Sequence, residues 1–532
     1  MGWNVRRQIV RRACYILSKR RRFEMRNIFK MVIALFVLVS FLALPRFGFA
    51  GDYTSGKEEK EKTKEETKGE KEAVKLEDMT VTATEEKEEV MLKPSATIIN
   101  VEEFKMPGTS QNVMDVLKTR AIIDFRGGSD LFVDRDPIYM RGFYGKRFIV
   151  ALDGLSIQTT HHGNDDVDYN QISFPQIESI EIIPGPHSPL YPGKSIGGVI
   201  NVKTKGLKRH ETMKPDLKVT TSYKSYNTQN HSMDINGGIG SFVYGLWYQK
   251  DHTDGYLRNR EADLDIITGR FGYILPSDGY IYLTASYSDS DYEEYVINDP
   301  ARSDYDPGYP DTPKVWRSYE PWQKPSMNKK DDSYRLAYKQ PTPIGLWTLG
   351  AYYHHQHHTG EKWDYIDKKN KAKGIERISS RDEKWREWGG RLQDEIQLFE
   401  DHLITVGFDM DNLYRNLMHS AWDRPESRGK YQKIIGMYGI YIQDKWNILP
   451  RLTLTPGLRY ENVDIFFRNW SERAKKYKNP LIPKDFIKRN HNQVVPKFFA
   501  TYELDDLSDV LRDTSISAGV SKIWTPISYC II

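Results

Sequence analysis

Cysteine and long apolar runs are both scarce in this chain of 532 residues. The two cysteines, Cys14 and Cys530, cannot build a disulfide framework or a paired-cysteine zinc site. The main apolar run, Met31–Leu44, has about 14 residues, whereas a helix that crosses a bilayer needs roughly 20. These absences exclude a disulfide-stapled domain and argue against a helical membrane protein.

An excess of charge of one sign is also absent, because 77 basic residues stand against 73 acidic ones and the net charge is +4. No basic block indicates a nucleic-acid partner. No nucleophile elbow, Walker loop or HExxH motif occurs, so we expect neither an enzyme nor a bound cofactor. Aromatic residues, in contrast, make up 12% of the chain. A polar chain rich in aromatics is compatible with a β-barrel, whose strands alternate apolar and polar residues.

The first 50 residues are typical of an export signal. A basic stretch, Arg20–Lys30, precedes the apolar run, and the small residues of Gly48-Phe49-Ala50 provide a cleavage site. Met25 would start a signal of ordinary length, which is compatible with Met1–Glu24 being an upstream mis-start. A single membrane helix is the alternative, and the shortness of the apolar run disfavours it.

Residues 51–76 form a charged linker whose centre, Lys57–Glu72, is nearly all lysine and glutamate. Without apolar residues such a segment cannot offset the entropy of ordering, so we expect a solvated tether. A short helix is the alternative, because both residue types favour helices. Either form acts as a spacer.

Residues 94–206 have the pattern of a small mixed α+β domain. Buried strands are predicted where β-branched and aromatic residues cluster, and a short helix where apolar residues recur at helical spacing. The strands are Ile98–Val101, Phe148–Leu152, Ile177–Ile183 and Val199–Val202, and the helix is Asn112–Lys118 with Ser110 as its cap. Asp153-Gly154 after the second strand predicts a tight turn.

From residue 215 to residue 532 the sequence alternates apolar and polar residues, which predicts about thirteen antiparallel strands. In the first of them Leu217, Val219 and Tyr223 share one face, and Lys218 and Lys224 share the other. Apolar residues facing out and polar residues facing in suit a barrel with a wet lumen. A soluble sandwich would turn its apolar face inward.

The connections between these strands alternate in length. Short turns are predicted at Gly240-Ser241, Pro276–Gly279, Gln340–Gly345, Phe399–His402 and Asn447–Arg451. Long loops are predicted at Asp251–Asp263, Ser288–Asp331, Thr359–Lys384, Leu413–Lys433 and Asn462–Gln493. Short periplasmic turns alternate with long extracellular loops in outer-membrane barrels, and a sandwich has no reason to keep this parity.

Four segments resemble the TonB-dependent receptor family. The first, Glu77–Glu85, is similar to the TonB box, of which it contains Asp78, Met79, Thr80, Val81, Thr82 and Ala83. Valine and threonine favour an extended backbone, and an extended segment can pair with the edge of a partner's sheet through main-chain hydrogen bonds. Its position after an export signal and before the small domain supports this interpretation.

The second and third segments are similar to the family's plug domain, and the fourth to a hairpin of its barrel, Tyr438–Trp446 with Leu452–Tyr460. The plug motif residues are Arg141, Gly142, Asp153, Gly154, Gly185, Pro186, Tyr191, Gly193, Gly197, Gly198 and Asn201. One departure is Pro184, where the family usually has an arginine that is thought to anchor the plug to the barrel wall.

The resemblance implies a fold and a mechanism. The fold is a mixed α+β plug domain inside an antiparallel transmembrane β-barrel of about 22 strands, of which about thirteen are present here. The resemblance places the chain in the cell outer membrane, in contact with its lipid, with the plug and the TonB box accessible to the periplasm. Ligand would bind from outside, and TonB, energised by ExbB-ExbD, would pull on the box and open a path.

The resemblance leaves the ligand open among ferric siderophores, cobalamin, haem and similar metal chelates. The candidate contacts are His161, His162, Tyr305, Tyr309, Trp316, Arg317 and Trp322. Imidazoles bind metals, and aromatic and guanidinium groups hold an aromatic or anionic chelate. His354, His355, His357 and His358 form a further cluster, of which only alternate members share a strand face. Loop packing is the alternative role for all of them, and no metal-ligand set is assigned.

The chain ends with Ile523–Ile532, in which the family-like sequence continues to Pro526 and the pattern then breaks, and about thirteen strands are fewer than the family's barrel holds. An open sheet edge in lipid leaves backbone groups unsatisfied, so we expect a truncated or frameshifted gene product. The alternatives to a transporter are a ligand-binding receptor without transport and a non-functional receptor fragment.

Overall fold

A computed structural model describes residues 97–105, 112–125, 138–144, 147–157, 169–185, 189–192, 195–206, 208–210, 212–314, 319–365, 376–419, 430–469, 486–504 and 514–524. The chain divides into two compact units, Met1–Lys75 and Leu76–Ile532, and every described residue belongs to the second. The predicted export signal, charged linker and TonB box lie outside the described residues. Within the described ranges, no helix has the length and apolar character to span a membrane.

Residues 97–206, called the plug below, contain a five-stranded sheet with the strand order β1-β7-β8-β5-β6. Its strands are β1 (Thr97–Asn100), β5 (Phe148–Leu152), β6 (Leu155–Ser156), β7 (Ile177–Pro184) and β8 (Gly198–Thr204). β5 and β8 are parallel, and the other neighbours are antiparallel. A second sheet joins β2 (Ile123–Phe125), β3 (Ile138–Met140) and β4 (Phe143–Tyr144).

Short helical segments cover the plug sheet and complete its core. They are η1 (Val101–Phe104), α3 (Val113–Leu117), η3 (Tyr169–Gln171) and η4 (Phe174–Gln176). Every residue of β5 is buried, which fits its predicted continuous apolar run, and Val101, Val116 and Ile177 pack in the same core. Two local predictions were wrong. Val101 begins η1 and does not end β1, and the cap of α3 is Asn112, whose Oδ1 accepts from the backbone N–H of Asp115. An Asn directly before the first helical residue can satisfy that N–H, which a residue further upstream cannot reach as well.

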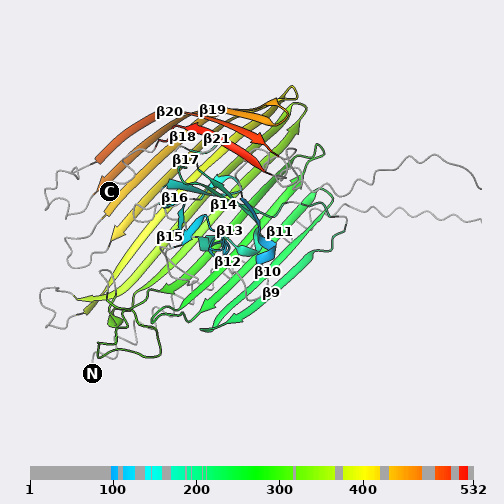
Figure 1. The fold of residues 1–532 in the computed structure, drawn as a ribbon. Helices are drawn as coiled ribbons and strands as arrows, with labels where there is room; N and C mark the ends of the chain where they lie inside the picture. Colours follow the sequence, from blue (N-terminus) through cyan, green and yellow to red (C-terminus); the bar gives the residue numbers. More distant parts are fainter. Residues whose placement is uncertain are drawn as a thin grey trace, which may run out of the picture. The chain divides into compact units, whose positions relative to one another are not determined.

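Among the described residues, those from Asp216 to Ser521 form one antiparallel sheet of thirteen strands, called the wall below, in which every strand pairs with its neighbour in sequence (Figure 1). The strands are β9 (Asp216–Lys224), β10 (Thr228–Ile239), β11 (Phe242–Thr253), β12 (Ala262–Ile274), β13 (Tyr280–Glu293), β14 (Ser326–Thr342), β15 (Gly345–Tyr365), β16 (Glu376–Leu398), β17 (His402–His419), β18 (Lys430–Leu449), β19 (Leu452–Asn469), β20 (Phe486–Glu503) and β21 (Ser515–Ser521). The predicted fold class, a mixed plug with an antiparallel barrel-type sheet, is confirmed, as is the predicted strand number.

The two faces of the wall differ as the alternation predicts. Arg459 on β19 is 2% exposed, whereas its neighbours Leu458 and Tyr460 are 47% and 36% exposed. Leu283 and Thr284 on β13 show the same contrast. At these positions polar residues face the side where the plug lies and apolar residues face away from it, whereas the face of β12 that carries Arg270 also buries Leu264 and Ile266.

The strands are longer than predicted, so the loops between them are shorter. β15 continues to Tyr365 and β16 begins at Glu376, although the sequence predicted a loop from Thr359 to Lys384. The predicted turn Gln340–Gly345 likewise shrinks to residues 343–344. Backbone pairing continues past the alternating segment because polar side chains in water do not disturb the hydrogen bonds between strands. These polar residues do not alternate with apolar ones, so the sequence pattern does not reveal them as strand. From β10 to β20 short and long connections still alternate, and they define a short-turn end and a long-loop end of the wall.

Candidate functional site: the contact between plug and wall

Four arginines of the wall donate hydrogen bonds to backbone carbonyls of the plug, and we call them the clasp arginines. They are Arg270 on β12, which donates to Lys205 (2.7 Å), Arg335 on β14, which donates to Leu152 (3.1 Å), Arg391 on β16, which donates to Leu190 (3.1 Å), and Arg459 on β19, which donates to Pro189 (3.4 Å). Each guanidinium also lies over an aromatic ring at 4.5 to 5.7 Å from the ring centre. Such stacking fixes the direction of the planar group, so the N–H donors face the plug.

Arg459 has the most complete set of partners. Its Nη atoms donate to both carboxylate oxygens of Asp409 at 2.7 Å, and its Nε donates to Glu461 at 2.8 Å. A bidentate guanidinium–carboxylate pair is among the stronger polar contacts in a protein. Two wall carboxylates thus hold the arginine that in turn reaches Pro189 of the plug.

The predicted Asp153-Gly154 turn lies against Arg270. Both turn residues have positive φ (50° and 78°), which matches the tight hairpin turn that Asp-Gly favours. The carboxylate of Asp153 accepts from the backbone N–H of Thr204 at 2.8 Å and from its hydroxyl at 2.7 Å, while Arg270 lies 3.6 Å from the same carboxylate. Gly154 donates its N–H to Oδ1 of Asn201 at 2.9 Å. Three of the predicted motif residues, Asp153, Gly154 and Asn201, therefore lie at or beside one turn that faces the wall.

Two glycines allow close packing, Gly198 inside the plug and Gly457 at the contact between plug and wall. Gly198 has φ +133°, and a Cβ there would lie 2.1 Å from the carbonyl oxygen of Ile183, so no other residue fits. Gly457 on β19 lies against the plug, and a Cβ there would lie 2.5 Å from Cγ of Pro189. The wall glycine allows close approach of the plug segment that Arg459 holds.

Glu102 in η1 joins the beginning of the plug to the beginning of the wall. Three lysines approach its carboxylate: Lys105 at 2.7 Å, Lys218 on β9 at 3.2 Å, and Lys205 at 3.4 Å. Partial burial by itself would raise the pKa of Glu102, but the lysines outweigh it and lower that pKa to about 2. Burial and the charge of Lys205 lower the pKa of Lys105 to about 8. Glu102 therefore stays charged, and its contribution to stability is lost only as pH falls from the ordinary range of a glutamate toward 2.

The opposite side of the plug meets the wall through amide side chains. The backbone N–H of Phe174 donates to Oε1 of Gln249 at 2.8 Å, and Gln356 donates to Gln171 at 3.4 Å. His354 and His358, on either side of Gln356 in β15, are buried on the same face. This is the alternation that the sequence predicted.

The other two histidines of that cluster face outward. His355 lies 3.4 Å from Asp332, and His357 lies 2.8 Å from Asp382. The inward pair has carboxylates at longer range, with 3.9 Å between His354 and Glu387 and 3.7 Å between His358 and Asp331. The four histidines thus do not come together in one site.

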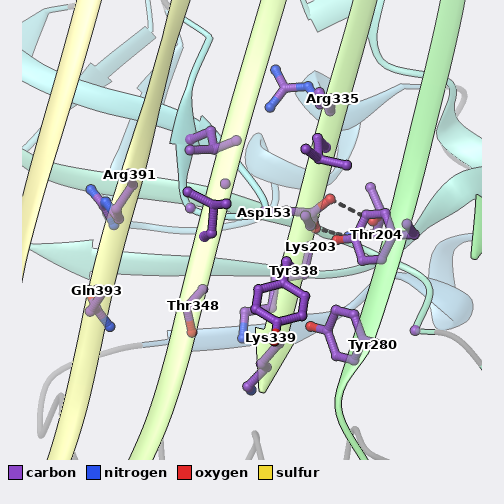
Figure 2. A pocket seen from close by; sticks show the side chains of 18 of the residues that line it. Asp153, Lys203, Thr204, Tyr280, Arg335, Tyr338, Lys339, Thr348, Arg391 and Gln393 are labelled. Carbon is purple, nitrogen blue, oxygen red and sulfur yellow. Dashed lines mark hydrogen bonds between the residues drawn. The ribbon is translucent and has the colours of Figure 1, made fainter. Parts of the chain in front are cut away.

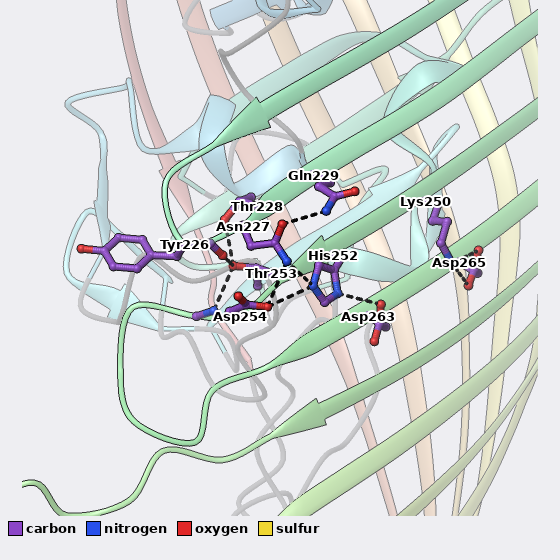
Figure 3. Close-up of polar contacts among 11 residues, drawn as sticks. Tyr226, Asn227, Thr228, Gln229, Lys250, His252, Thr253, Asp254, Asp263 and Asp265 are labelled. Carbon is purple, nitrogen blue, oxygen red and sulfur yellow. Dashed lines mark hydrogen bonds and ion pairs between the residues drawn. The ribbon is translucent and has the colours of Figure 1, made fainter. Parts of the chain in front are cut away.

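A histidine–carboxylate group that sequence reasoning missed lies at the long-loop end of β11 and β12. The ligand atoms of His252, Glu261 and Asp263 lie within 4.8 Å of one another. Figure 3 shows His252 between Asp254 and Asp263, at 3.1 and 3.0 Å from its two ring nitrogens. Both carboxylates can accept a hydrogen bond from this imidazole when it is protonated, so Asp254 and Asp263 orient the ring.

The loop between β13 and β14 carries Tyr305, Tyr309 and Trp322, which we proposed from the sequence as ligand contacts. Tyr305 donates its hydroxyl to Asp311 at 3.0 Å, and Tyr309 accepts at its carbonyl from Asn298 at 3.1 Å. Trp322 belongs to η5 (Pro321–Gln323) at the end of the loop. The hydrogen bond to Asp311 raises the pKa of Tyr305. The loop is thus held by its own polar contacts.

Asn298 is the centre of that loop. It is 1% exposed, and its Nδ2 donates to the carbonyls of Asp306, Tyr309 and Pro310 at 2.9 to 3.1 Å, while its Oδ1 accepts from the N–H of Asp306 at 2.9 Å. Asn298→Ala is expected to lower the free energy of local unfolding of the loop by about 2–4 kcal/mol, because several bonds are lost together. Hydrogen exchange at the amides of Asp306 and Thr312 measures this. Ser303→Ala, an exposed position of the same loop, serves as the control, and equal exchange in the two variants would contradict the assignment.

Several proposed site residues lie outside the described residues. They are the TonB box Asp78–Ala83, the plug motif residues Pro186 and Gly193, and the candidate ligand contacts His161, His162, Trp316 and Arg317. Arg141 and Gly142 are described and form a turn with φ of 51° and 81°. Gly185 also has positive φ, and Tyr191 lies under the guanidinium of Arg391.

Sequence reasoning missed the clasp arginines and the lysines around Glu102. The alternation did place Arg335 and Arg459 on the polar face, and an inward arginine between two outward apolar residues is the signal that identifies such positions. No pattern in the sequence connects them to the carbonyls of the plug.

Comparison with known families gives two matches. The family model described as "TonB-dependent Receptor Plug Domain" matches residues 90–199, and the one described as "TonB dependent receptor-like, beta-barrel" matches residues 272–529. Together they cover well over half of the chain, and they match in the order in which the plug and the wall occur.

Similar proteins and structures agree with these matches. The vitamin B12 transporter BtuB of Vibrio vulnificus is 27% identical over 208 residues, which are 38% of this chain and 30% of that protein. The iron-regulated outer membrane virulence protein of Vibrio cholerae is 25% identical over 341 residues, or 57% of this chain and 49% of that protein. The chain thus spans about half or less of the length of these relatives.

Among solved structures, the ferric yersiniabactin uptake receptor FyuA from Yersinia pestis has a TM-score of 0.60 at 16% identity, with 77% of this chain and 62% of that chain covered. The copper transporter OprC has a TM-score of 0.61 at 15% identity, with 81% and 63% covered. At these identities the likeness shows the fold alone.

Proposed function

The chain belongs to the TonB-dependent receptor family, and from this premise we propose that it is an outer-membrane receptor for energy-coupled uptake of a scarce metal chelate. Members of the family are transporters and receptors of the outer membrane. The proposed cargo is a ferric siderophore or a similar chelate such as cobalamin or haem. The names of similar proteins support this range, since they include a vitamin B12 transporter and a ferric enterobactin receptor.

The observation that carries the proposal is the polar character of the plug–wall contact. The clasp arginines and the lysines around Glu102 meet the plug through hydrogen bonds and ion pairs. When such contacts separate in a wet lumen, water replaces the lost partners, whereas separation of an apolar core would expose apolar surface. A plug held in this way can move while the wall keeps its own strand pairing.

The proposed energy source acts at the segment before the plug. Residues Asp78–Ala83 would pair with TonB, which ExbB-ExbD energises, at the periplasmic side. Tension on this segment would first reach β1, an edge strand of the plug sheet with four residues paired to β7, and then Glu102. Ligand and TonB must favour the same displaced state of the plug for uptake to follow.

Of the proposed ligand contacts, Tyr305, Tyr309 and Trp322 lie in the β13–β14 loop, at the long-loop end. Together with His161, His162, Trp316 and Arg317, which lie outside the described residues, they would offer aromatic, imidazole and guanidinium groups. These groups hold an aromatic or anionic chelate by stacking, cation–π contact and hydrogen bonds.

Deletion of Thr80–Ala83 tests the function. Cells limited for iron or cobalamin are given ⁵⁵Fe-loaded siderophores or labelled cobalamin, and binding at the surface and uptake are measured separately. The deletion is expected to reduce uptake to background while surface binding stays unchanged. Deletion of Lys60–Thr63, which shortens the linker by the same length, is the control and should transport.

Two results would contradict the proposal. Surface binding without uptake in the unaltered protein would favour a receptor that does not transport. Undiminished uptake by the Thr80–Ala83 deletion would show that this segment does not couple to TonB.

A further inference from the structure

A cavity of about 280 Å³ lies between the plug and the wall at the short-turn end. Its plug side includes the Asp153-Gly154 turn and the end of β8, and its wall side includes residues of β12 to β16. Figure 2 shows the wall residues spread over neighbouring strands, from Tyr280 on β13 to Arg391 and Gln393 on β16. The volume is at the lower end of small-molecule sites, which suits a compact organic anion.

The lining of the cavity has an excess of positive charge, with six basic side chains against three acidic ones. The basic residues are Lys203, Lys205, Arg270, Arg335, Lys339 and Arg391. The acidic residues are Asp153, Glu178 and Glu395. An excess of one sign in a partly dry space attracts the opposite charge more strongly than the same groups would in bulk water.

Two of the arginines have donor groups that the plug does not use. Arg335 is 9% exposed, and its Nη1 donates to Leu152, but its buried Nε has no hydrogen-bond partner. The same holds for Nε of Arg391, whose Nη2 donates to Leu190. A buried N–H without an acceptor costs free energy, and an anionic oxygen is the acceptor that a guanidinium binds best.

The spacing of the two arginines favours an anion with more than one charged group. They lie on β14 and β16, which are separated by β15, and they pair with β15 residues two positions apart, so their backbones are about 12 Å apart. Long side chains from these positions reach toward the same cavity, and a ligand with several carboxylates or similar groups can engage both at once.

We propose that this cavity is an exit-side site that binds the anionic groups of a polyanionic metal chelate, whose oxygens accept from Arg335 and Arg391. This inference rests on the proposed uptake function and names the charge class of its cargo. In the seated plug the two arginines hold the carbonyls of Leu152 and Leu190. When the plug moves, those carbonyls leave, and the freed N–H groups face the passage. The same residues thus hold the plug in the closed state, where the basic lining already attracts the anion, and offer it further N–H groups once the plug has moved.

Citrate is the probe for this site, because it carries three carboxylates and is compact. Isothermal titration of the purified protein in detergent is expected to show citrate binding, and Arg335→Gln with Arg391→Gln should weaken it at least about tenfold through two lost charge-assisted bonds. Lys339→Gln, which lines the cavity but is not a clasp residue, should weaken it severalfold. Arg386→Gln, exposed on the outer face of β16, is the matched control and should bind as the unaltered protein does.

Protection of the plug from trypsin shows whether the double variant is folded. If the double variant is not folded, citrate binding by Lys339→Gln tests the proposal in its place. Absence of citrate binding to the unaltered protein would overturn the proposal. Equal binding by the unaltered protein and Lys339→Gln, together with equal binding by a folded double variant, would also overturn it. A failure of the proposed uptake function gives a different result from a failure of this binding site. In that case cells take up no chelate, but the purified protein still binds citrate in detergent.

Discussion

Replacing Arg459 with methionine is expected to destabilise the folded protein by about 3–5 kcal/mol, because it leaves two buried carboxylates without their partner. The guanidinium of Arg459 donates to both oxygens of Asp409 and to Glu461, and it also reaches the carbonyl of Pro189 in the plug. Methionine fills a similar volume but offers no donor. Unfolding in guanidinium chloride, followed by tryptophan fluorescence, measures the loss.

Two further variants separate charge from packing at Arg459. Arg459→Met combined with Asp409→Asn and Glu461→Gln removes the stranded charges and should recover part of the stability. Arg386→Met, on the exposed face of β16, removes an arginine without this network and should change stability by less than about 0.5 kcal/mol. Equal stability of Arg459→Met and Arg386→Met would show that the buried network contributes nothing.

Gly198→Ala is expected to prevent the plug from folding while leaving the wall intact. The residue has φ +133°, and its new Cβ would lie 2.1 Å from the carbonyl oxygen of Ile183, in the strand that pairs with β8. Backbone strain alone costs about 1–3 kcal/mol, and the clash with a paired backbone atom adds to it. Limited trypsin digestion should cut within residues 97–206 and spare the wall.

Gly142→Ala is the matched control, since Gly142 also has positive φ (81°) but has no atom within 4 Å of the added Cβ. It should cost only about 1–2 kcal/mol and leave the plug protected. Equal protection of the plug in Gly198→Ala and Gly142→Ala would refute the close approach of β7 and β8.

The parts of this structure that local chemistry determines could be predicted from the sequence. The alternation of apolar and polar residues predicted the strands of the wall and the face to which Arg459 belongs. Asp153-Gly154 gave its turn, because both residues tolerate positive φ. Strand ends were missed where the alternation stops, as in the segment from Thr359 to Lys384, because backbone pairing outlasts the side-chain pattern.

The contacts of the candidate site could not be predicted, because their partners lie far apart in the chain. Arg459 and Pro189 are separated by 270 residues, and Arg335 and Leu152 by 183. The three lysines around Glu102 come from different places in the chain: Lys105 directly follows η1, Lys205 follows β8, and Lys218 lies in β9. A sequence pattern identifies a charged residue on the inner face, but only the fold determines which carbonyl or carboxylate it meets.

A disulfide between plug and wall tests the central claim, that the plug is seated against the inner face of the wall and must move for uptake. A Cβ on Gly350 of β15 would lie 3.1 to 3.4 Å from side-chain carbons of Leu155 in β6, which is close enough for Leu155→Cys and Gly350→Cys to be bridged. Both native cysteines are replaced by serine in this background, and Leu155→Cys alone is the control.

The measurement is chelate uptake by cells that carry the pair, before oxidation, after oxidation and after reduction. The account predicts that the disulfide forms in the folded protein, that oxidation stops uptake while surface binding persists, and that reduction restores uptake. Failure of the disulfide to form in folded protein, or unchanged uptake by the fully oxidised pair, would contradict it.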